Sequence, residues 1–499
     1  MNFMKYSKYI FITLVAAFAA HFAAAQRPIR LQVRPEVVPD SIDLSFYGKK
    51  NPWIATGEVV GLNLGIWAID RYIQKAEFAY INANTIKRNF KRGFVWDNDQ
   101  MGTNMFLHPY HGNLYFNSAR SNGYNFWQSG LFALGGSAMW EFFMENEYPS
   151  ANDIIATPVG GMALGELTYR ASDIVLKDNS TGWERFGREA AAFLITPTRG
   201  LTRIINGDAW RYRPTTGRQF GIPNVAIEFS TGLRTIELKD EIFDEGSGGV
   251  FQLNLEYGDR FEVASTPLPY DYFAFNAELN MHKSQPVLGQ LNITGRLISK
   301  ELLDKYTTSM SIGMYQHFDY YDSDTISDVS AKVPYKLGVP ASVGAGLMFR
   351  DIHRGMFAFD AYLHANGIGL GAILSDYYNV DHRNYNLASG FSLKGGANMV
   401  FKREFLSLAA SYEYYRLFTW DGYPEDIDWS MVNPHTLDAQ GDRSVASFGV
   451  FSARANIKVW RRLYATLHFS HYLRSTHYHY HPSVHSSTYA LRLMLSYKL

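Results

Sequence analysis

The alternation of apolar and polar residues at the end of the chain limits the fold more than any other feature. In the segment 487–499, one face is apolar and aromatic, and the other is small, polar or charged. The faces are Tyr489, Leu491, Leu493, Leu495, Tyr497 and Leu499 on one side, and Ala490, Arg492, Met494, Ser496 and Lys498 on the other. Because side chains alternate across a strand, this stretch predicts a strand between an apolar and a polar environment. The alternation recurs back to about Pro223, which favours a closed barrel with a polar interior.

The residues from 223 to 499 contain about twelve such segments, and an even number brings both barrel ends to one side of a membrane. We expect strands at 223–235, 248–259, 270–282, 288–299, 307–319, 341–351, 356–366, 387–401, 404–417, 445–459, 462–474 and 487–499. From the fourth strand on, short turns alternate with long loops, which is typical of outer-membrane barrels whose short turns face the periplasm. The early connections, 236–247 and 283–287, fit less well, so a miscount of two strands stays open.

The first residues, 1–25, predict a secretory signal peptide. Two lysines precede a short apolar run, and the small residues 23–25 suit cleavage before Gln26. The alternative is an N-terminal membrane anchor, which is disfavoured because the run is shorter than the roughly 20 residues of a spanning helix. Residues 26–50 contain three prolines and no sustained periodicity, so we expect an extended linker.

The composition excludes several classes of function. The chain has no cysteine, which rules out disulfides and thiolate chemistry. Its 47 Lys and Arg residues balance its 47 Asp and Glu residues, so we expect no nucleic-acid partner. The sequence has no nucleophile-elbow, phosphate-loop, dinucleotide-binding or H-E-x-x-H motif. Its motifs therefore indicate no particular cofactor.

Residues 51–217 predict an α-helical domain. We expect helices at Trp53–Tyr72, Asn84–Arg92, Tyr124–Asn146, Ser150–Leu176 (kinked at Pro158) and Trp183–Asn206 (interrupted near Pro197). In the first helix, Gly57, Gly61 and Gly65 recur every four residues, and Gly161 and Gly165 repeat the spacing. Such a stripe of small residues predicts that another helix approaches closely.

The end of the helical domain is basic. Its arginines are Arg185, Arg188, Arg199, Arg203, Arg211, Arg213 and Arg218. Two interpretations are open: contact with the headgroups of a membrane surface, or a solvated basic face.

Histidines and carboxylates in the helical domain form the candidate catalytic site. The residues are His108, His111, Glu141 and Asp153, with Glu166 as a further carboxylate. These side chains supply general bases and metal ligands. Glu141 ends one expected helix and Asp153 begins the next, so the two carboxylates can converge at one corner. Pro109 separates the histidines, so we do not expect them on a regular helix. The alternative is a structural polar network in which Asp153 stabilises a helix start.

A histidine cluster in the last hairpin is the candidate metal site. Six of the 15 histidines lie there: His468, His471, His477, His479, His481 and His485. His477, His479 and His481 alternate, so in an extended segment they would share a face suited to Zn or Cu. The alternative is a polar surface loop. Acidic residues in the loops 320–340 and 418–444 lack the glycine and distal glutamate of a calcium loop, so we expect solvated loops there that meet divalent cations bridging surface lipid.

A family resemblance covers roughly residues 85–206. Its motifs are His108-Pro-Tyr-His111-Gly112, Tyr115, Ala119-Arg120, Gly136-Ser137, Trp140-Glu141, Asn152-Asp153, Thr157-Pro158, Gly160-Gly161, Gly165-Glu166 and Arg188-Glu189. In this combination the chain resembles the Bacteroidetes envelope family catalogued as domain of unknown function 3943. The resemblance implies an outer-membrane or periplasmic setting. It implies no activity, so it assigns no catalytic residue.

The sequence therefore predicts an α+β protein: a transmembrane antiparallel β-barrel of about twelve strands, preceded by a periplasmic or plug-like helical domain. Its expected role is lipid or small-solute handling, or scaffolding, in the outer membrane of a Gram-negative cell. The alternative is a membrane-lipid or glycan hydrolase that uses the corner of His108, His111, Glu141 and Asp153. Outer-membrane lipid is the expected partner, together with a periplasmic partner bound through the helical domain.

Overall fold

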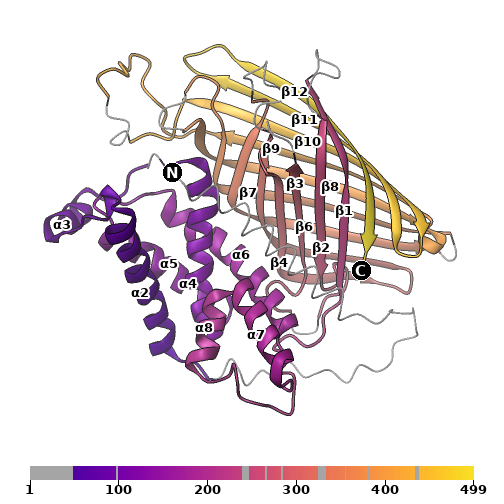
Figure 1. Ribbon diagram of the computed structural model, residues 1–499. Coiled ribbons are helices and arrows are strands. Elements are labelled where there is room, and N and C mark those ends of the chain that lie inside the picture. Colours follow the sequence, from indigo (N-terminus) through magenta and orange to yellow (C-terminus); the bar gives the residue numbers. More distant parts are fainter. Residues whose placement is uncertain are drawn as a thin grey trace. The chain divides into compact units, whose positions relative to one another are not determined.

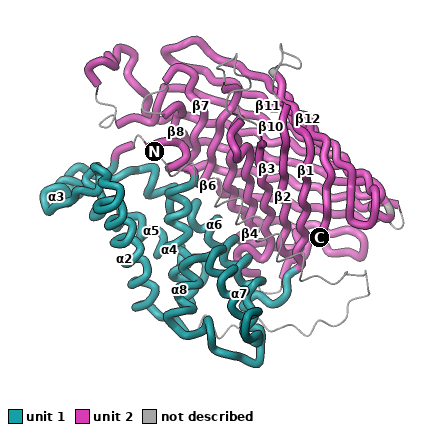
Figure 2. The backbone as a smooth tube through the Cα atoms, in the orientation of Figure 1, with its two compact units in different colours: residues 1–94, 106–223 teal, residues 95–105, 224–499 magenta. Residues whose placement is uncertain are grey.

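The chain forms two compact units, shown in Figure 2. The computed structural model describes residues 49–96, 99–238, 247–264, 267–281, 285–323, 333–353, 356–378, 383–432 and 438–499. The helical unit comprises the chain up to Phe94 and Phe106–Pro223, and the barrel unit comprises Val95–Met105 and Asn224–Leu499. The predicted signal peptide and nearly all of the predicted linker lie outside the described residues.

Twelve antiparallel strands close into a barrel in which β1 pairs with β12 (Figure 1). They are β1 Val225–Leu238, β2 Ser247–Tyr257, β3 Phe273–Met281, β4 Leu288–Asp304, β5 Thr308–Asp322, β6 Lys336–His353, β7 Phe357–Leu374, β8 Tyr385–Phe401, β9 Leu406–Phe418, β10 Ser444–Trp460, β11 Leu463–Tyr478 and β12 Val484–Lys498. The predicted barrel and strand count are confirmed. Strand β7 extends eight residues past its predicted end at 366. An irregularity between Ile368 and Gly371 breaks the alternation there and hid the extension.

The alternation seen in the sequence sorts residues between the two faces of the wall. Arg234 pairs with Arg492 and Ser230 with Ser496, and all four side chains are buried inside. Leu493, which lies between Arg492 and Ser496 along β12, points to the outside and is 60% exposed. The wall is therefore apolar outside and polar inside where these strands meet, as the period of two requires.

The turns at the two barrel ends differ in length. At the end where β1 begins and β12 ends, four connections are short: 305–307, 354–356, 402–405 and 461–462. The connection 258–272 between β2 and β3 is the exception at this end. It packs back onto the barrel: the Tyr270 hydroxyl donates to Gln316 Oε1 at 3.1 Å, and Asp271 pairs with Arg296 at 2.7 Å.

Ion pairs cross the interior of the barrel. Arg492 Nη2 on β12 donates to Glu278 Oε1 on β3 at 3.0 Å, its Nε lies 2.6 Å from Glu278 Oε2, and Arg234 lies 3.5 Å from the same carboxylate. A second group places Lys394 Nζ 2.5 Å from Asp319 and 3.7 Å from Glu413. Inward charges of both signs therefore pair with one another at these two places. Buried charges need such partners, because removal from water costs several kcal/mol for each ion.

A cluster of apolar side chains fills the interior next to these charges. It draws residues from β1, from each of β5 to β12, and from the loop before β6. Tyr335 from that loop stacks on Tyr472 with ring centroids 4.3 Å apart, and Phe448 lies 5.5 Å from Tyr335. Its members come from most of the circumference, and rings meet across the interior, as Tyr321 on β5 does with Phe448 on β10 at 5.6 Å.

The segment Val95–Met105 belongs to the barrel unit although it interrupts the helical one. Asn104 Nδ2 donates to the Tyr385 hydroxyl at 2.8 Å, and that hydroxyl donates to the Asp99 carbonyl. A Cβ added to Gly338 would lie 2.5 Å from Met105 Sδ. Tyr385 begins β8 and Gly338 lies near the start of β6, so the segment contacts the wall near its long-loop end.

The helical unit contains the expected helices and one that the sequence did not predict. Its elements are α2 Pro52–Ala68, a π-helix Ile69–Gln74, a 3₁₀ turn Glu77–Ala79, α3 Ala83–Arg92, α4 His108–Ser121, α5 Phe126–Phe143, α6 Asp153–Val175, α7 Gly182–Ile195 and α8 Pro197–Ile205. A π-helix, Thr103–Leu107, leads into α4. No helix among the described residues meets the length and hydropathy of a membrane-spanning segment.

The expectation about Pro109 was wrong. Proline is tolerated in the first turn of a helix, where its missing N–H would have no partner in any case. Helix α4 therefore starts at His108 and carries His111 in its first turn. Helix α6 likewise continues through Pro158, close to its start.

The two glycine stripes behave differently. A Cβ on Gly161 would lie 2.5 Å from Gly112 Cα, so α4 and α6 cross in direct backbone contact, as the sequence predicts. A Cβ on Gly57, Gly61 or Gly65 would meet nothing within 4 Å. The predicted close approach of a helix to this second stripe is therefore wrong for the described residues.

The buried ion pairs predict a stability effect inside the barrel. Replacing Glu278 with Gln leaves Arg492 and Arg234 buried without their counter-charge, which costs about 3–5 kcal/mol. We expect the unfolding midpoint in urea, followed by heat-modifiable migration on gels, to fall markedly. Glu301→Gln, at an exposed carboxylate on β4, is the matched control and should leave the midpoint in place. An equal midpoint for both variants would contradict the importance of the interior pair.

Candidate functional site

The predicted histidine and carboxylate corner forms between α4, α5 and α6. His108 Nε2, at the start of α4, lies 3.3 Å from Asp153 Oδ1, at the start of α6. His111 follows one turn later, with its ring centroid 6.5 Å from that of His108. Trp140 of α5 covers His111 at 5.7 Å. The structure thus brings the two histidines and Asp153 into one corner and forms a His–Asp pair.

Glu141 occupies the same corner but already has a structural partner. Its Oε2 accepts the backbone N–H of Ser150 at 2.7 Å, and its side chain is buried. Asp153 also accepts Asn152 Nδ2 at 3.0 Å, and its own N–H donates to Ser150 Oγ at 3.1 Å. These bonds order the turn that leads into α6, which supports the structural interpretation of both carboxylates.

The protonation of the corner follows from burial. Burial, assisted by the neighbouring His108, lowers the pKa of His111 to about 4. His111 is therefore a neutral imidazole near pH 7 and can accept a proton. Burial and the charge of Glu141 raise the pKa of Tyr115, so its hydroxyl stays protonated. It donates to Asn63 Oδ1 at 2.5 Å. The corner could serve as a general base, and it equally satisfies the demands of a packed polar core.

Glu166 belongs to a separate group of charges. Arg120 donates to both of its oxygens, at 2.7 and 2.8 Å, and Arg170 donates at 3.0 Å. Burial raises the pKa of this carboxyl, but the two guanidinium groups outweigh burial and the net pKa is lowered. A fully buried, doubly paired carboxylate of this kind is a structural element that ties α4 to α6.

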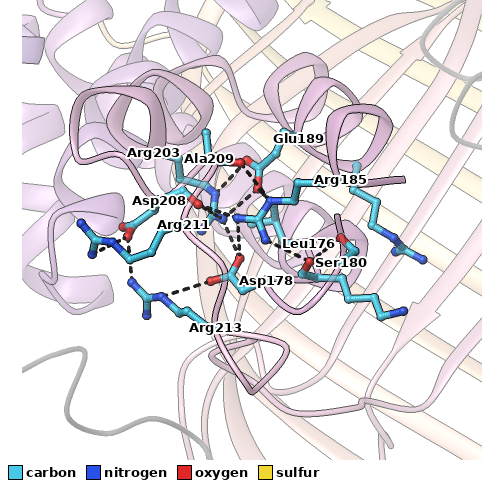
Figure 3. A network of polar contacts seen from close by, with 12 residues as sticks. Leu176, Asp178, Ser180, Arg185, Glu189, Arg203, Asp208, Ala209, Arg211 and Arg213 are labelled. Atoms are coloured by element: carbon cyan, nitrogen blue, oxygen red, sulfur yellow. Dashed lines mark hydrogen bonds and ion pairs between the residues drawn. The ribbon is translucent and has the colours of Figure 1, made fainter. Parts of the chain in front are cut away.

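The basic segment is an internal network, as Figure 3 shows. Asp178 accepts Arg203 at 2.7 Å and Arg185 at 3.1 Å, and Glu189 bridges the same two arginines at 2.8 and 2.9 Å. Arg199 is buried separately against Asp173 at 2.6 Å. Arg185, Arg199 and Arg203 are therefore paired inside the unit, whereas the Arg211 side chain is 59% exposed, so the two interpretations stay open for the exposed arginines only.

An apolar groove lies between α2 and α8, and the sequence did not predict it. Its volume is about 600 Å³, and its lining consists of Ile54, Gly57, Glu58, Gly61, Leu62, Gly65, Ile66, Ile69, Leu201 and Ile205. Glu58 is the only charged residue of α2 and is 6% exposed. Thr202 Oγ1 donates to its Oε1 at 2.7 Å and Asn122 Nδ2 to its Oε2 at 3.3 Å. A lone carboxylate in an apolar helix was the signal that could have drawn attention to this place.

Burial makes Glu58 hard to ionise. Desolvation raises its pKa from 4.5 to about 7, against the lowering effect of the hydrogen bonds from Thr202 and Asn122. A substantial fraction of this carboxyl is therefore protonated near neutral pH.

The predicted metal residues have separate neighbours. His477 Nδ1 lies 2.7 Å from Ser483 Oγ, the His479 ring lies against Tyr480, and the His481 ring stacks on Tyr377 at 4.6 Å. Strand β11 ends at Tyr478, so the three do not continue one extended face. Among the described residues, no three His, Cys, Asp or Glu side chains are placed to hold a metal ion. The binding of Zn or Cu there stays a prediction.

Two of the described outer-loop acids have protein partners. Asp322 accepts the Tyr320 hydroxyl at 2.8 Å, and Asp428 accepts Ser430 Oγ at 2.6 Å. The loop residues 324–332 and 433–437 lie outside the described part of the chain.

The family resemblance is confirmed. Residues 93–198 match the family model described as a domain of unknown function, DUF3943. The match covers α4, α5, α6 and the histidine corner, but well under half of the chain, and the description names no activity. No curated protein matches the chain.

Solved structures of outer-membrane proteins match a little over half of the chain. The NanC porin is 7% identical with a TM-score of 0.27, over 55% of this chain and 100% of that one. The COG4313 outer membrane channel from Pseudomonas putida F1 is 10% identical with a TM-score of 0.26, over 55% of this chain and 95% of that one. The CymD monoaromatic hydrocarbon channel is 11% identical with a TM-score of 0.23, over 55% and 87%. At these scores the likeness carries no argument about what the protein transports or binds.

The raised pKa of Glu58 predicts how stability depends on pH. The folded state binds the proton more tightly than the unfolded state, so this group stabilises the fold below about pH 4.5 and loses that contribution as the pH rises to about 7. The shift corresponds to about 3 kcal/mol. We expect Glu58→Gln to be more stable than the wild type at pH 8 and to lose that advantage at pH 4.5, in denaturant unfolding of the full chain followed by helical circular dichroism.

The comparison between wild type and Glu58→Gln matters because His111 shifts in the opposite direction. Its lowered pKa makes the fold less stable as the pH falls from about 6.5 to about 4, over nearly the same range. The difference between the two proteins isolates Glu58. A difference that stays constant from pH 4.5 to pH 8 would contradict the assignment.

Proposed function

We propose that this protein is an outer-membrane barrel with a closed lumen that holds a lipid-handling helical unit in the cell envelope. Three parts of this proposal have different support: the closed lumen rests on interior packing, the membrane location on the outer face of the wall, and the lipid role on the apolar surface of the helical unit.

The filled lumen carries the proposal. Tyr335, Phe448 and Tyr472 pack against one another, with buried charges next to them at Lys394 and Glu278. Barrels of about eight strands fill with side chains, whereas those of sixteen or more leave an aqueous channel. At the level of the cluster, side chains fill the interior of this twelve-stranded barrel, as they do in the smaller barrels. This packing favours an anchor or scaffold over an open pore.

The outer face of the wall supports a membrane location. Outward residues of β12 and β1 are large and exposed, such as Leu233 at 69% and Leu493 at 60%. A soluble barrel would leave this apolar surface in water, at a cost of roughly 25 cal/mol for each Å². A hydrocarbon environment removes that cost, and the even strand number suits a bacterial outer membrane.

The helical unit supports a role in lipid handling. It exposes large apolar side chains on several helices, including Trp53 at 86%, Leu131 at 67% and Trp183 at 86%. Soluble proteins rarely leave extended apolar surface uncovered unless it binds a partner or a membrane. We propose the periplasmic side for this unit, because β1 follows it directly and begins at the short-turn end of the barrel.

The closed lumen predicts an electrical result. In planar lipid bilayers we expect the purified wild type to give no stable conductance steps, because aromatic packing and ion pairs block the path. Removing three rings, by Tyr335→Ala with Phe448→Ala and Tyr472→Ala, should raise the conductance above that baseline. Tyr377→Ala, at a partly exposed loop ring, is the control and should not. Stable ohmic steps from the wild type would instead favour a solute channel.

A hydrolase is the second candidate, and the pair of His108 and Asp153 at 3.3 Å is the observation that favours it. The neutral His111 beside it supplies a base, and a water molecule would be the nucleophile. The reaction would be hydrolysis of an ester or glycosidic bond in an envelope lipid or glycan.

The hydrolase candidate predicts that His108→Ala abolishes release of label from a labelled phospholipid or glycan while heat-modifiable migration of the barrel persists. His108→Gln, which keeps a hydrogen-bonding group but no base near pH 7, should also be inactive. If the wild type releases no label, or if the variant retains full turnover, the corner is structural.

A further inference from the structure

The uncovered glycine stripe of α2 forms one wall of the apolar groove. Gly57, Gly61 and Gly65 all line it, and a Cβ added to any of them would meet no other atom within 4 Å among the described residues. The opposite wall comes from Leu201 and Ile205 of α8. Helix α2 is apolar on all sides, so this face does not gain from contact with water. The groove therefore calls for an apolar occupant.

The dimensions of the groove favour a slender occupant. Its lining runs along α2 from Ile54 to Ile69, which at the helical rise corresponds to about 22 Å. A volume of about 600 Å³ spread over this length describes an elongated apolar space. A single hydrocarbon chain fits such a space better than a protein helix does.

Glu58 holds the two walls of the groove together, and its carboxyl is not available to bind a charged ligand. Both carboxyl oxygens accept hydrogen bonds from the protein, one from Thr202 on α8 and one from Asn122 after α4. These bonds join α2 to α8 beside the groove. Because the carboxyl is already satisfied by donors of the protein, the middle of the groove does not select for a cation, and a polar headgroup belongs at an end.

Both ends of helix α2 have a cation beside an aromatic ring. Before α2, Lys50 Nζ lies over the Tyr124 ring at 5.5 Å. Beyond Ile69, the Arg71 guanidinium lies over the Tyr80 ring at 3.3 Å, and its Nη1 is buried without a hydrogen-bond partner among the described residues. Cations with aromatic rings at the edge of an apolar site suit an anionic headgroup at the level of a membrane interface.

We propose that the groove between α2 and α8 binds one acyl chain of an anionic membrane lipid, with the headgroup at an end of α2. This deepens the proposed function, since it rests on the lipid role of the helical unit and names the site and the ligand class. It does not rest on the closed lumen, so conductance measurements and the following experiment fail independently.

The test uses the full-length protein in lipid nanodiscs and a long-chain fatty acid with a photoreactive diazirine in its tail. After illumination, labelled peptides are located by mass spectrometry. We expect label on the peptides that contain residues 54–69 and 201–205. Gly61→Leu with Gly65→Leu fills the groove without a backbone clash and with better helix formers. This variant should reduce the label there by roughly tenfold.

Gly135→Leu is the matched control. Gly135 also lies within a helix of this unit, α5, and a Cβ there meets nothing within 4 Å. It should leave the groove label unchanged. Label spread over α5, or label in the groove that the filled variant retains, would overturn the site while leaving a general lipid role in place. Absence of label, together with a dimer that the filled variant converts to monomer, would overturn it in favour of a second copy of the chain as occupant.

Discussion

The packing of inward side chains across the barrel is the interaction on which the rest of the structure depends. Tyr335 extends from a loop and packs against Phe448 and Tyr472 on the neighbouring strands β10 and β11. The wider cluster of apolar side chains packs inside the ring of strands. The charges beside it, Glu278 and Lys394, are tolerable only because arginine and aspartate reach them inside the barrel. Loss of the aromatic contact would admit water to these ion pairs and would weaken both the apolar cluster and the ion pairs.

A filled lumen changes what the remaining parts of the chain have to do. If solutes do not pass through the barrel, the chemistry of the protein lies on its surfaces and in the helical unit. Buried polar side chains hold that unit together, among them Glu166, Asp178 and Glu58. The first two belong to fully paired networks that rigidify the bundle. Glu58 differs because its carboxyl accepts hydrogen bonds from neutral donors, Thr202 and Asn122, and also lines the apolar groove. The same residue therefore joins α2 to α8 and forms part of the proposed binding surface.

The sequence predicted the barrel well because the faces of each strand are encoded locally. Leu493 and Arg492 are neighbours in the chain and point to opposite faces of β12. The apolar and charged side chains therefore show which face of the strand is lipid-facing and which is polar. The histidine corner was predicted in part: His108 and Asp153 do meet, whereas Glu166 joined Arg120 instead. The assignment of Pro109 failed because a proline that breaks a helix interior also starts a helix well.

Other features could not be predicted because their contacts are distant in the chain. Glu58 meets Thr202 across 144 residues, so no local pattern reports the groove. The glycine stripe on α2 has the same spacing as Gly161 and Gly165, yet within the described part of the chain the latter pair is covered and the α2 stripe is not. Spacing gives the shape of a helix face, and only the fold decides whether a partner packs there. Among the arginines after Trp183, the sequence likewise does not show that Arg185, Arg199 and Arg203 face buried carboxylates while Arg211 stays exposed.

The most direct test of the account is the accessibility of the lumen to a small, charged thiol reagent. The chain has no cysteine, so single substitutions report without background. Ser392→Cys and Ser230→Cys place a thiol at buried, inward positions, and Ser483→Cys places one on an exposed loop. The account predicts rapid reaction at 483 and no reaction at 392 or 230 in the folded protein in nanodiscs. Reaction at 392 and 230 at the rate seen for 483 would mean an open, water-filled barrel, and would contradict it.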